Sequence, residues 1–150
     1  MSASQDFPDC FHRVTIKGLC VRDDKVLLIR ESDKLSGKWE LPGGGLDFGE
    51  DIPTAFKREV AEEMGLKVSK MSANPVYVWT HKYENKRGLA WFYSVVLAYR
   101  VEFEDLAITP TEECEAIEFF SKDGLQGVDL SGQMTEFDGI FDPSDFKEKF

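Results

Sequence analysis

The sequence has few cysteines, no long apolar run and too few basic residues to balance its acidic ones. Its three cysteines, Cys10, Cys20 and Cys114, are an odd number without metal-type spacing, so reduced thiols are expected instead of a disulfide framework. No run approaches the roughly 20 apolar residues that a membrane-spanning helix needs, so no membrane partner is expected. Residues 1–8 also lack a basic stretch followed by apolar residues. Such a stretch marks a secretion signal, so a cytoplasmic location is predicted.

The shortage of basic residues narrows the class of partner. The chain has 18 Lys and Arg against 28 Asp and Glu, a formal net charge of −10. Proteins that bind nucleic-acid polymers present a basic surface to the phosphates, so a polymer of this kind is not expected as a partner. An acidic protein can still hold a small phosphorylated molecule when a bound divalent cation supplies the positive charge locally.

The 150 residues contain no internal repeat, low-complexity tract or linker, which predicts a single domain over residues 1–150. Within this domain, residues 1–10 and 130–150 are expected to be flexible or peripheral. Alternating and β-branched residues predict strands over residues 12–21, 25–30, 76–80, 89–101 and 116–120. The first two are expected to form a hairpin that turns at Asp23-Asp24.

One strong helix is predicted over residues 52–64. Asp51 is a good N-cap, Pro53 lies in the first turn and Gly65 lies where the helix ends. Residues 123–142 are predicted to form loops, and residues 145–150 a short closing helix. Strands on both sides of one helix in the sequence predict an α/β or α+β sandwich with a mixed sheet.

Three glutamates share one narrow face of this predicted helix. At about 100° per residue, Glu63 lies about 40° to one side of Glu59, and Glu62 lies about 60° to the other. A solvated acidic face is the alternative interpretation, which the segment EVAEE favours when it is taken alone. Converging carboxylates also suit hard cations such as Mg²⁺ or Mn²⁺. The run Gly43-Gly44-Gly45 just upstream allows the backbone to approach a ligand closely.

The whole stretch from Gly44 to Leu66 resembles the Nudix box. That pattern is Gly, five residues, Glu, seven residues, Arg-Glu, an aliphatic residue, any residue, Glu-Glu, any residue, Gly and an aliphatic residue. The chain matches every defined position, with Gly44, Glu50, Arg58-Glu59, Val60, Glu62-Glu63, Gly65 and Leu66. The resemblance covers about a sixth of the chain. It implies a fold of the α/β class, a Nudix-like α/β/α sandwich with a mixed β-sheet.

The resemblance also implies a function. Nudix enzymes are Mg²⁺-dependent hydrolases, with Mn²⁺ as an alternative ion. They cleave the pyrophosphate bond of a nucleoside diphosphate linked to another moiety and release a nucleoside monophosphate. A nucleoside triphosphate, a nucleotide sugar and a dinucleoside polyphosphate all stay open as substrates. The alternatives are a catalytically silent nucleotide-binding or regulatory domain and an isoprenoid-diphosphate isomerase-like enzyme, and the intact box favours the hydrolase. Because dimers are frequent among Nudix proteins, a homodimer is also expected.

Carried over by motif, the metal ligands are Glu59, Glu62, Glu63 and the carbonyl of Gly43. Arg58 is expected to orient Glu59 and Glu62 by charge-assisted hydrogen bonds, and Glu50 to make a structural contact. The box does not fix the general base. Glu113 is favoured over Glu112 by its offset from the strand at residues 116–120, while solvated charge is an equally good interpretation of both. The expected catalytic set is therefore Glu59, Glu62, Arg58 and Glu113.

Substrate-binding residues are harder to derive from sequence. Arg30, at the end of a predicted strand, is a candidate phosphate ligand. The aromatic residues Trp39, Phe48, Tyr83 and Trp91 are candidates for stacking on a base. For each of these residues, ordinary surface exposure or core packing is the alternative.

Overall fold

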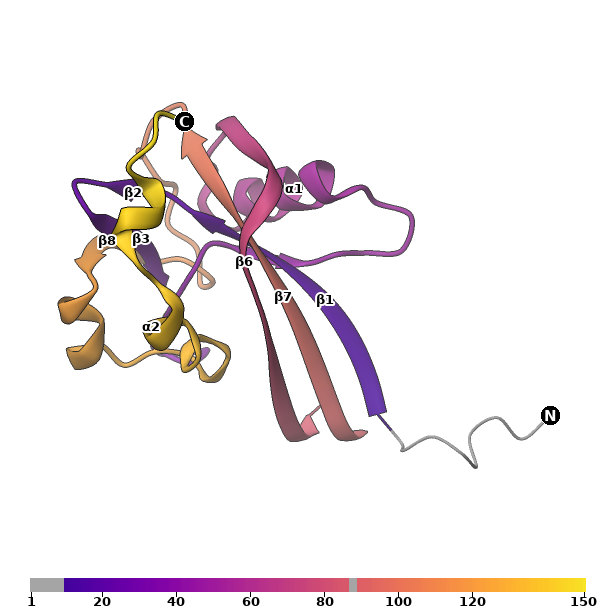
Figure 1. Ribbon diagram of the computed structural model, residues 1–150. Helices are drawn as coiled ribbons and strands as arrows, with labels where there is room; N and C mark the ends of the chain where they lie inside the picture. The colour runs from indigo at the N-terminus through magenta and orange to yellow at the C-terminus, as the bar shows by residue number, and fades with distance from the viewer. Residues whose placement is uncertain (1–9, 87–88) are drawn as a thin grey trace.

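Two β-sheets form the centre of the computed structural model, which describes residues 10–86 and 89–150 (Figure 1). The first sheet has the strand order β5-β1-β7-β6 and contains β5 (Gly43–Gly45), β1 (Cys10–Leu19), β7 (Leu89–Phe103) and β6 (Val68–Lys86). Strand β1 runs parallel to β7, whereas the β1–β5 and β6–β7 pairs are antiparallel. The predicted mixed sheet is therefore confirmed.

The second sheet is built on β3 (Lys25–Arg30), which pairs with β2 (Val21–Arg22), β4 (Trp39–Glu40) and β8 (Ala116–Ser121). The predicted hairpin of residues 12–21 with 25–30 is wrong in its extent, because β1 ends at Leu19 and belongs to the other sheet. Only the short β2 continues the hairpin, through Asp23 and Asp24 with φ of 50° and 63°. Such positive φ values suit a two-residue hairpin turn. Alternation shows which face a side chain occupies but not which strand it pairs with.

Strand β6 is much longer than the predicted segment 76–80. It covers residues 68–86, with register shifts between Met71 and Pro75 and between Pro75 and Tyr77. Proline cannot donate to a sheet hydrogen bond and is tolerated at such irregularities. The irregular pairing interrupts the period-two pattern, which explains why sequence analysis found only the regular part.

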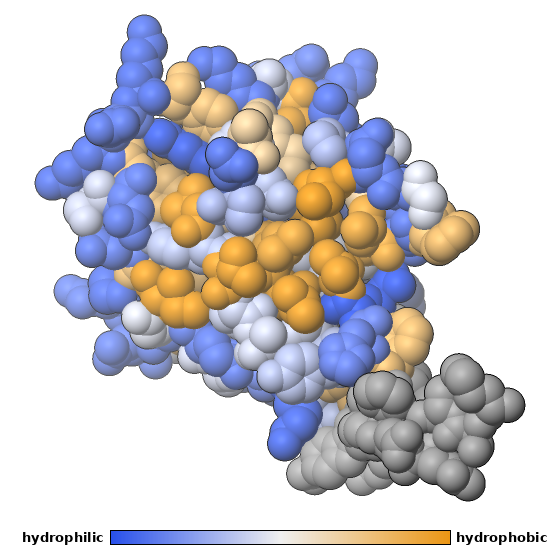
Figure 2. Space-filling model, turned by 45° about the vertical axis from the view of Figure 1, so that its right-hand side comes forward, coloured by the Kyte–Doolittle hydropathy of each residue, from blue (hydrophilic) through white to orange (hydrophobic). Residues whose placement is uncertain are grey.

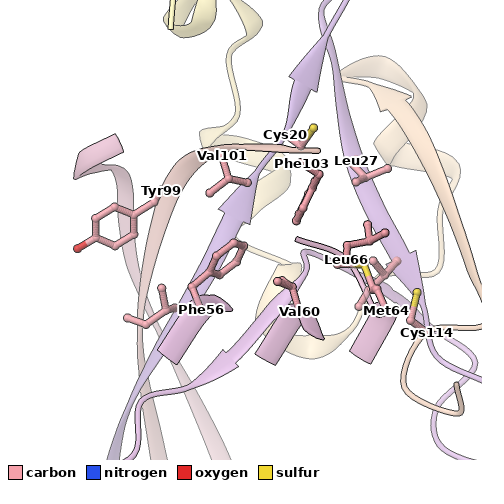
Figure 3. Packing of buried hydrophobic residues seen from close by; sticks show 12 residues of the cluster. Cys20, Leu27, Phe56, Val60, Met64, Leu66, Tyr99, Val101, Phe103 and Cys114 are labelled. Atoms are coloured by element: carbon pink, nitrogen blue, oxygen red, sulfur yellow. The ribbon is translucent and has the colours of Figure 1, made fainter. Parts of the chain in front are cut away.

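Helix α1 (Ile52–Met64) has the predicted bounds. The Asp51 side chain accepts a hydrogen bond from the Thr54 N–H at 2.8 Å, and Gly65 ends the helix with φ of 70°. The apolar face of the helix points at strands β7 and β3, as Figure 3 shows for the labelled residues. The fully buried members of this face are Phe56, Val60 and Met64. They form one core with Tyr99, Val101, Phe103 and Leu27.

The opposite side of the sheets is covered by the C-terminal segment. It forms η2 (Asp123–Gly127), η3 (Gly132–Met134), α2 (Phe137–Ile140) and η4 (Pro143–Phe146). The prediction of loops over residues 123–142 is therefore wrong where these short helices lie, and the closing helix occupies 143–146 instead of 145–150. A helix of one turn is too short to show a 3.6-residue period.

This C-terminal segment contributes to a second apolar core. Its buried side chains are Leu125, Met134, Phe137, Phe141 and Phe146, which pack with Trp79, Val96, Leu28 and Leu41. Residues 130–150, expected to be flexible or peripheral, thus supply four of these buried side chains. With α1 on one side and the short helices on the other, the molecule is an α/β/α sandwich (Figure 1).

The molecular surface carries some exposed apolar area. On the face shown in Figure 2, apolar side chains gather in a band that hydrophilic residues surround. Across the residues whose burial is described, the large exposed apolar side chains are Phe11, Leu35, Phe48 and Val78. Within the described ranges, no helix has both the length and the apolar character required to span a bilayer.

Candidate active site

A cleft of about 560 Å³ opens beside helix α1 and the glycine strand β5. This volume lies within the range of small-molecule sites. Five glutamates line it: Glu31, Glu40, Glu59, Glu63 and Glu113. The cations in the lining are Arg13, Lys17 and Lys38. Two acids of the helix and one from the loop before β8 therefore reach a common space, although they are far apart in the sequence.

The glycines of β5 bring the backbone against the acidic side of the helix. Gly43 has φ of 122°, a conformation that side-chain-bearing residues rarely adopt, and its N–H donates to Glu63 Oε1 at 3.0 Å. A Cβ on Gly44 would collide with the Glu59 carboxyl group. Glycine at both positions is therefore required for the two carboxylates to lie against this strand.

Glu63 is an unusual helix residue, because only 4% of its surface is exposed. Burial raises the pKa of its carboxyl group to about 8, while the charge of Lys17 and the Gly43 N–H act in the opposite direction. A buried carboxylate without a full set of partners gains from a nearby cation. Glu63 thus has the electrostatic environment in which a bound cation would be favoured.

Lys17 is a buried residue of this site that sequence analysis missed. It is 4% exposed, and its ammonium donates to the carbonyl oxygens of Leu41 and Gly43, both at 3.0 Å. The Glu40 carboxylate lies 3.8 Å away. The Gly43 carbonyl, predicted to be a metal ligand, therefore accepts a hydrogen bond from Lys17. The sequence did contain an indication of this. Lys17 lies two residues from both Thr15 and Leu19, so it occupies the same, inward-facing side of strand β1.

Arg58 organises the exposed side of the acidic cluster. Its guanidinium donates two hydrogen bonds of 2.8 Å to Glu50, and its Nη1 lies 3.0 Å from Glu59 and 3.4 Å from Glu62. The hydrogen bonds from Arg58 lower the pKa of Glu50 to about 2. Glu50 consequently stays ionised and fixes the guanidinium. The expected contacts of Arg58 with Glu59 and Glu62 are both present.

The donor chemistry of the site fits a hard cation. Mg²⁺ prefers oxygen ligands, and the cleft offers the carboxylates of Glu59 and Glu63, with no Cβ at Gly44 to fill the space beside Glu59. Glu62 lies at the rim, with 58% of its side chain exposed. Over residues 10–86 and 89–150, no three carboxylate, imidazole or thiolate groups already converge into a ligand set. Arg58 and the Gly43 amide hold the box glutamates in hydrogen bonds instead.

The two candidates for the general base lie in different places. Glu113 lines the cleft, and its pKa is raised by burial and by the negative charges of Glu59 and Glu62. Glu112 lies in another surface hollow and is 3.5 Å from the ammonium of Lys34. The structure thus brings Glu113, and not Glu112, together with the box glutamates.

Arg30 and Trp39, two of the predicted substrate residues, lie outside the cleft lining. The Arg30 guanidinium is paired with Asp33 at 2.7 Å and with Glu115. The Trp39 ring packs edge-on against Phe120, with ring centroids 5.1 Å apart. Both side chains therefore have structural contacts that explain their positions without a bound substrate.

The remaining aromatic candidates differ in position. Tyr83 lines the cleft, as predicted for a substrate-binding residue. Phe48 lines a separate surface hollow and is fully exposed. The side chain of Trp91 lies outside the described part of the chain.

A second hollow of about 510 Å³ lies where the start of α1 meets β6. Lys57 and Lys70 contribute to its lining, together with Ile52, Met71 and Tyr99. This lining contains no carboxylate. The hollow therefore does not offer the acidic donors that a divalent cation requires.

The chain is similar to curated proteins over part of its length. The chain is 43% identical over 67 residues to a MutT-like protein of Streptomyces ambofaciens, covering 44% of this chain and 42% of that protein. It is 41% identical over 54 residues to an ADP-ribose pyrophosphatase of Methanocaldococcus jannaschii, covering 35% and 32%. The alignments thus span less than half of the length of either curated relative.

Solved structures cover much more of the chain. A MutT NUDIX hydrolase from Burkholderia pseudomallei is 27% identical, with a TM-score of 0.62 over 87% of this chain and 95% of that one. A MutT protein from Methanosarcina mazei is 20% identical, with a TM-score of 0.66 over 91% and 96%, which shows a shared fold. A family model of the NUDIX domain matches residues 11–140. The chain therefore belongs to the NUDIX domain family.

Proposed function

We propose that the protein is a Mg²⁺-dependent hydrolase, with Mn²⁺ as an alternative ion. It cleaves the pyrophosphate bond of a nucleoside diphosphate linked to another moiety and releases a nucleoside monophosphate. The observation that carries this proposal is the cleft in which Glu59, Glu63 and Glu113 lie beside a backbone strand of three glycines. The pyrophosphatase and MutT-like relatives support the same reaction class.

In this proposal, Glu59, Glu62 and Glu63 hold the cation. The Gly43 carbonyl has two lone pairs, of which Lys17 uses one, and the other is available to the ion. When bound, Mg²⁺ neutralises phosphate oxygens and makes water a better nucleophile. The chain's own contribution is to keep these oxygen donors in one cleft, through Gly43, Gly44 and Arg58.

Glu113 acts as the general base and takes a proton from the attacking water. Its pKa is raised by burial and by the neighbouring acids. A carboxylate becomes a stronger base as its pKa moves toward neutrality. Arg58 stays charged and holds Glu59 and Glu62, and so contributes by positioning.

The two other function classes fit the cleft less well. A silent binding domain needs no intact acidic set, whereas here the carboxylates of Glu59, Glu63 and Glu113 all reach the cleft. An isoprenoid diphosphate would need an apolar wall for its chain. Most of the residues that line the cleft are charged, hydroxylated or glycine, so it lacks such a wall.

The reaction is tested by incubating the purified protein with Mg²⁺ and a panel of nucleoside triphosphates, nucleotide sugars and dinucleoside polyphosphates. Released nucleoside monophosphate is quantified by chromatography. We expect at least one class to be cleaved, and cleavage to stop when the metal is chelated. No monophosphate from any member would reject the proposal.

The base assignment is tested with a matched pair of variants. Glu113→Gln is expected to lower kcat by about 100-fold, the scale of general acid–base catalysis. Glu112→Gln removes a neighbouring carboxylate that lies outside the cleft and is expected to leave kcat within about twofold. Equal effects of the two substitutions would reject Glu113 as the base.

We further propose that the protein forms a homodimer in the cytoplasm. The apolar band of Figure 2 supports self-association, and the buried free thiols of Cys20 and Cys114 suit a reducing compartment. Light scattering coupled to size-exclusion chromatography measures the molecular mass and so tests the homodimer. A monomeric mass at micromolar concentration would contradict it.

A further inference from the structure

Three hydroxyl groups at the floor of the cleft have no hydrogen-bond partner among the residues that the structure describes. Thr15 is 7% exposed and Ser94 is 2% exposed, and both line the cleft. The Ser131 hydroxyl is buried without a partner and belongs to the same lining. Of the three hydroxyl oxygens, that of Ser131 is itself buried, and burial without a partner carries a desolvation cost. Three hydroxyls without a protein partner in one cleft indicate a ligand that would satisfy them.

The strand register places these hydroxyls beside aromatic rings. Ser94 of β7 lies between Arg13 of β1 and His81 of β6. One row along the same face, Tyr83 pairs with Phe92, and their rings are 6.0 Å apart at 68°. Both residues line the cleft, but only 3% of Phe92 is exposed, so Phe92 supports the ring of Tyr83 from behind. The floor therefore combines hydroxyl groups with the aromatic ring of Tyr83.

The turn that carries Ser131 is anchored to both sheets. The Ser131 N–H donates to the Trp39 carbonyl at 3.0 Å, and the Trp79 indole N–H donates to the Gln133 carbonyl at 2.9 Å. These contacts fix the turn at residues 131–133 beside β4 and β6. The three hydroxyls thus lie on supported backbone, which reduces the ordering cost of binding.

We propose that Thr15, Ser94 and Ser131 bind the polar edge of the substrate's nucleobase, with the base's ring against Tyr83. This inference rests on the proposed function and specifies which end of the substrate the floor recognises. Hydroxyls both donate and accept, so they can pair with the ring nitrogens and exocyclic groups of a base. Aromatic side chains supply the flat surface on which a base packs.

The same features argue against other occupants of the floor. An apolar chain would leave all three hydroxyls unsatisfied. A sugar would use the hydroxyls but not the ring surface of Tyr83. The nucleobase is the part of the substrate that uses both kinds of group.

The test compares affinities for nucleoside monophosphates with the affinity for ribose 5-phosphate, which lacks a base. Dissociation constants for AMP, GMP, CMP, UMP and ribose 5-phosphate are measured calorimetrically with Mg²⁺ for the wild type, Thr15→Val and Ser94→Ala. We expect at least one monophosphate to bind about tenfold or more tightly than ribose 5-phosphate. Each substitution should lower the affinity for that monophosphate by about two- to tenfold, the range of one neutral hydrogen bond. Ribose 5-phosphate binding should not change.

Melting temperatures separate this role from a structural one. Because their hydroxyls have no partner in the free protein, Thr15→Val and Ser94→Ala should keep or raise its Tm. Ser72→Ala is the matched control, because its hydroxyl donates to the Asn74 carbonyl at 2.8 Å and accepts from the Arg100 N–H at 3.1 Å. It should lower Tm and leave the affinities unchanged.

Several results would overturn the inference. The first is that the wild type binds the monophosphates no more tightly than ribose 5-phosphate, or binds neither. The second is that Thr15→Val and Ser94→Ala lose as much affinity for ribose 5-phosphate as for the monophosphate. The third is that the Tm of these variants falls as much as that of Ser72→Ala. The hydrolysis panel is scored separately. Selective binding of a monophosphate without any hydrolysis would reject the proposed function alone. Hydrolysis without selective binding of a monophosphate would reject this inference alone.

Discussion

Gly44 and Glu59 lie so close together that the carboxylate occupies the space a side chain at position 44 would need. The sequence predicted the glycine run and the glutamates separately, from the backbone freedom of glycine and from helical spacing. Gly44 and Glu59 are also both defined positions of the Nudix box. Lys17 could not be derived in this way, because its partners are backbone carbonyls of Leu41 and Gly43, which no residue pattern records.

Gly44→Ala tests this close approach. The added methyl group would displace the Glu59 carboxylate, so we expect kcat to fall at least about tenfold while the fold is kept. Kinetics and a thermal melt measure the two effects. Gly139→Ala is the control, because a Cβ there meets no atom within 4 Å. An unchanged kcat in Gly44→Ala would contradict the role of this contact.

Lys17→Met tests the buried ammonium. The change leaves two carbonyl oxygens without their donor and removes the positive charge that acts on Glu63, so we expect a loss of about 2 to 4 kcal/mol in the free energy of unfolding. Urea denaturation measures it. Lys25→Met, at an exposed strand end, should change stability by less than about 0.5 kcal/mol. Similar losses in both variants would show that the buried contacts of Lys17 contribute little.

Helix α1 is the element that sequence analysis predicted best, since its bounds are marked by a cap at Asp51 and a glycine at Gly65. Its apolar and acidic faces follow from helical spacing alone. The short helices after β8 were missed because each is too short for a period, and their positions depend on tertiary packing of Phe137 and Phe141. The division of the strands between two sheets was missed for a similar reason.

The acidic face of α1 predicts a pH dependence of stability in the metal-free protein. The pKa of Glu63 is raised from 4.5 to about 8, so the folded protein binds more protons than the unfolded chain between these values. Stability should therefore be highest below pH 4.5 as far as this group is concerned and fall as pH rises toward 8. Melting temperatures in a chelator from pH 5 to 8.5 measure this. Glu63→Gln should flatten the slope, and an identical slope in both proteins would refute it.

The whole molecule is a sandwich with two apolar cores, one under α1 and one under the C-terminal helices. The site lies where these parts meet, because α1 supplies two acids, β5 the backbone, and the turn at residues 131–133 another part of the lining. Composition predicted an acidic single domain, but the cleft itself depends on how both cores hold their elements.

Phe137→Ala tests the contribution of the second core. Phe137 is fully buried in it, so its truncation should cost about 3 to 5 kcal/mol in the free energy of unfolding. Phe48→Ala is the matched control, because Phe48 is fully exposed, and it should cost less than about 0.5 kcal/mol. Urea denaturation measures both. A small effect at Phe137 would mean that the C-terminal helices are not integral to the fold.

The account as a whole depends on where a metal-bound diphosphate sits. The most direct measurement is a crystal structure with Mg²⁺ and a nucleotide analogue whose bridging oxygen is replaced by a methylene group, which resists hydrolysis. We expect the phosphates and the cation in the cleft, with the carboxylates of Glu59 and Glu63 facing the ion and the base over Ser94. An analogue bound instead in the hollow beside Lys57 and Lys70, with the cleft carboxylates facing no ion, would contradict the account.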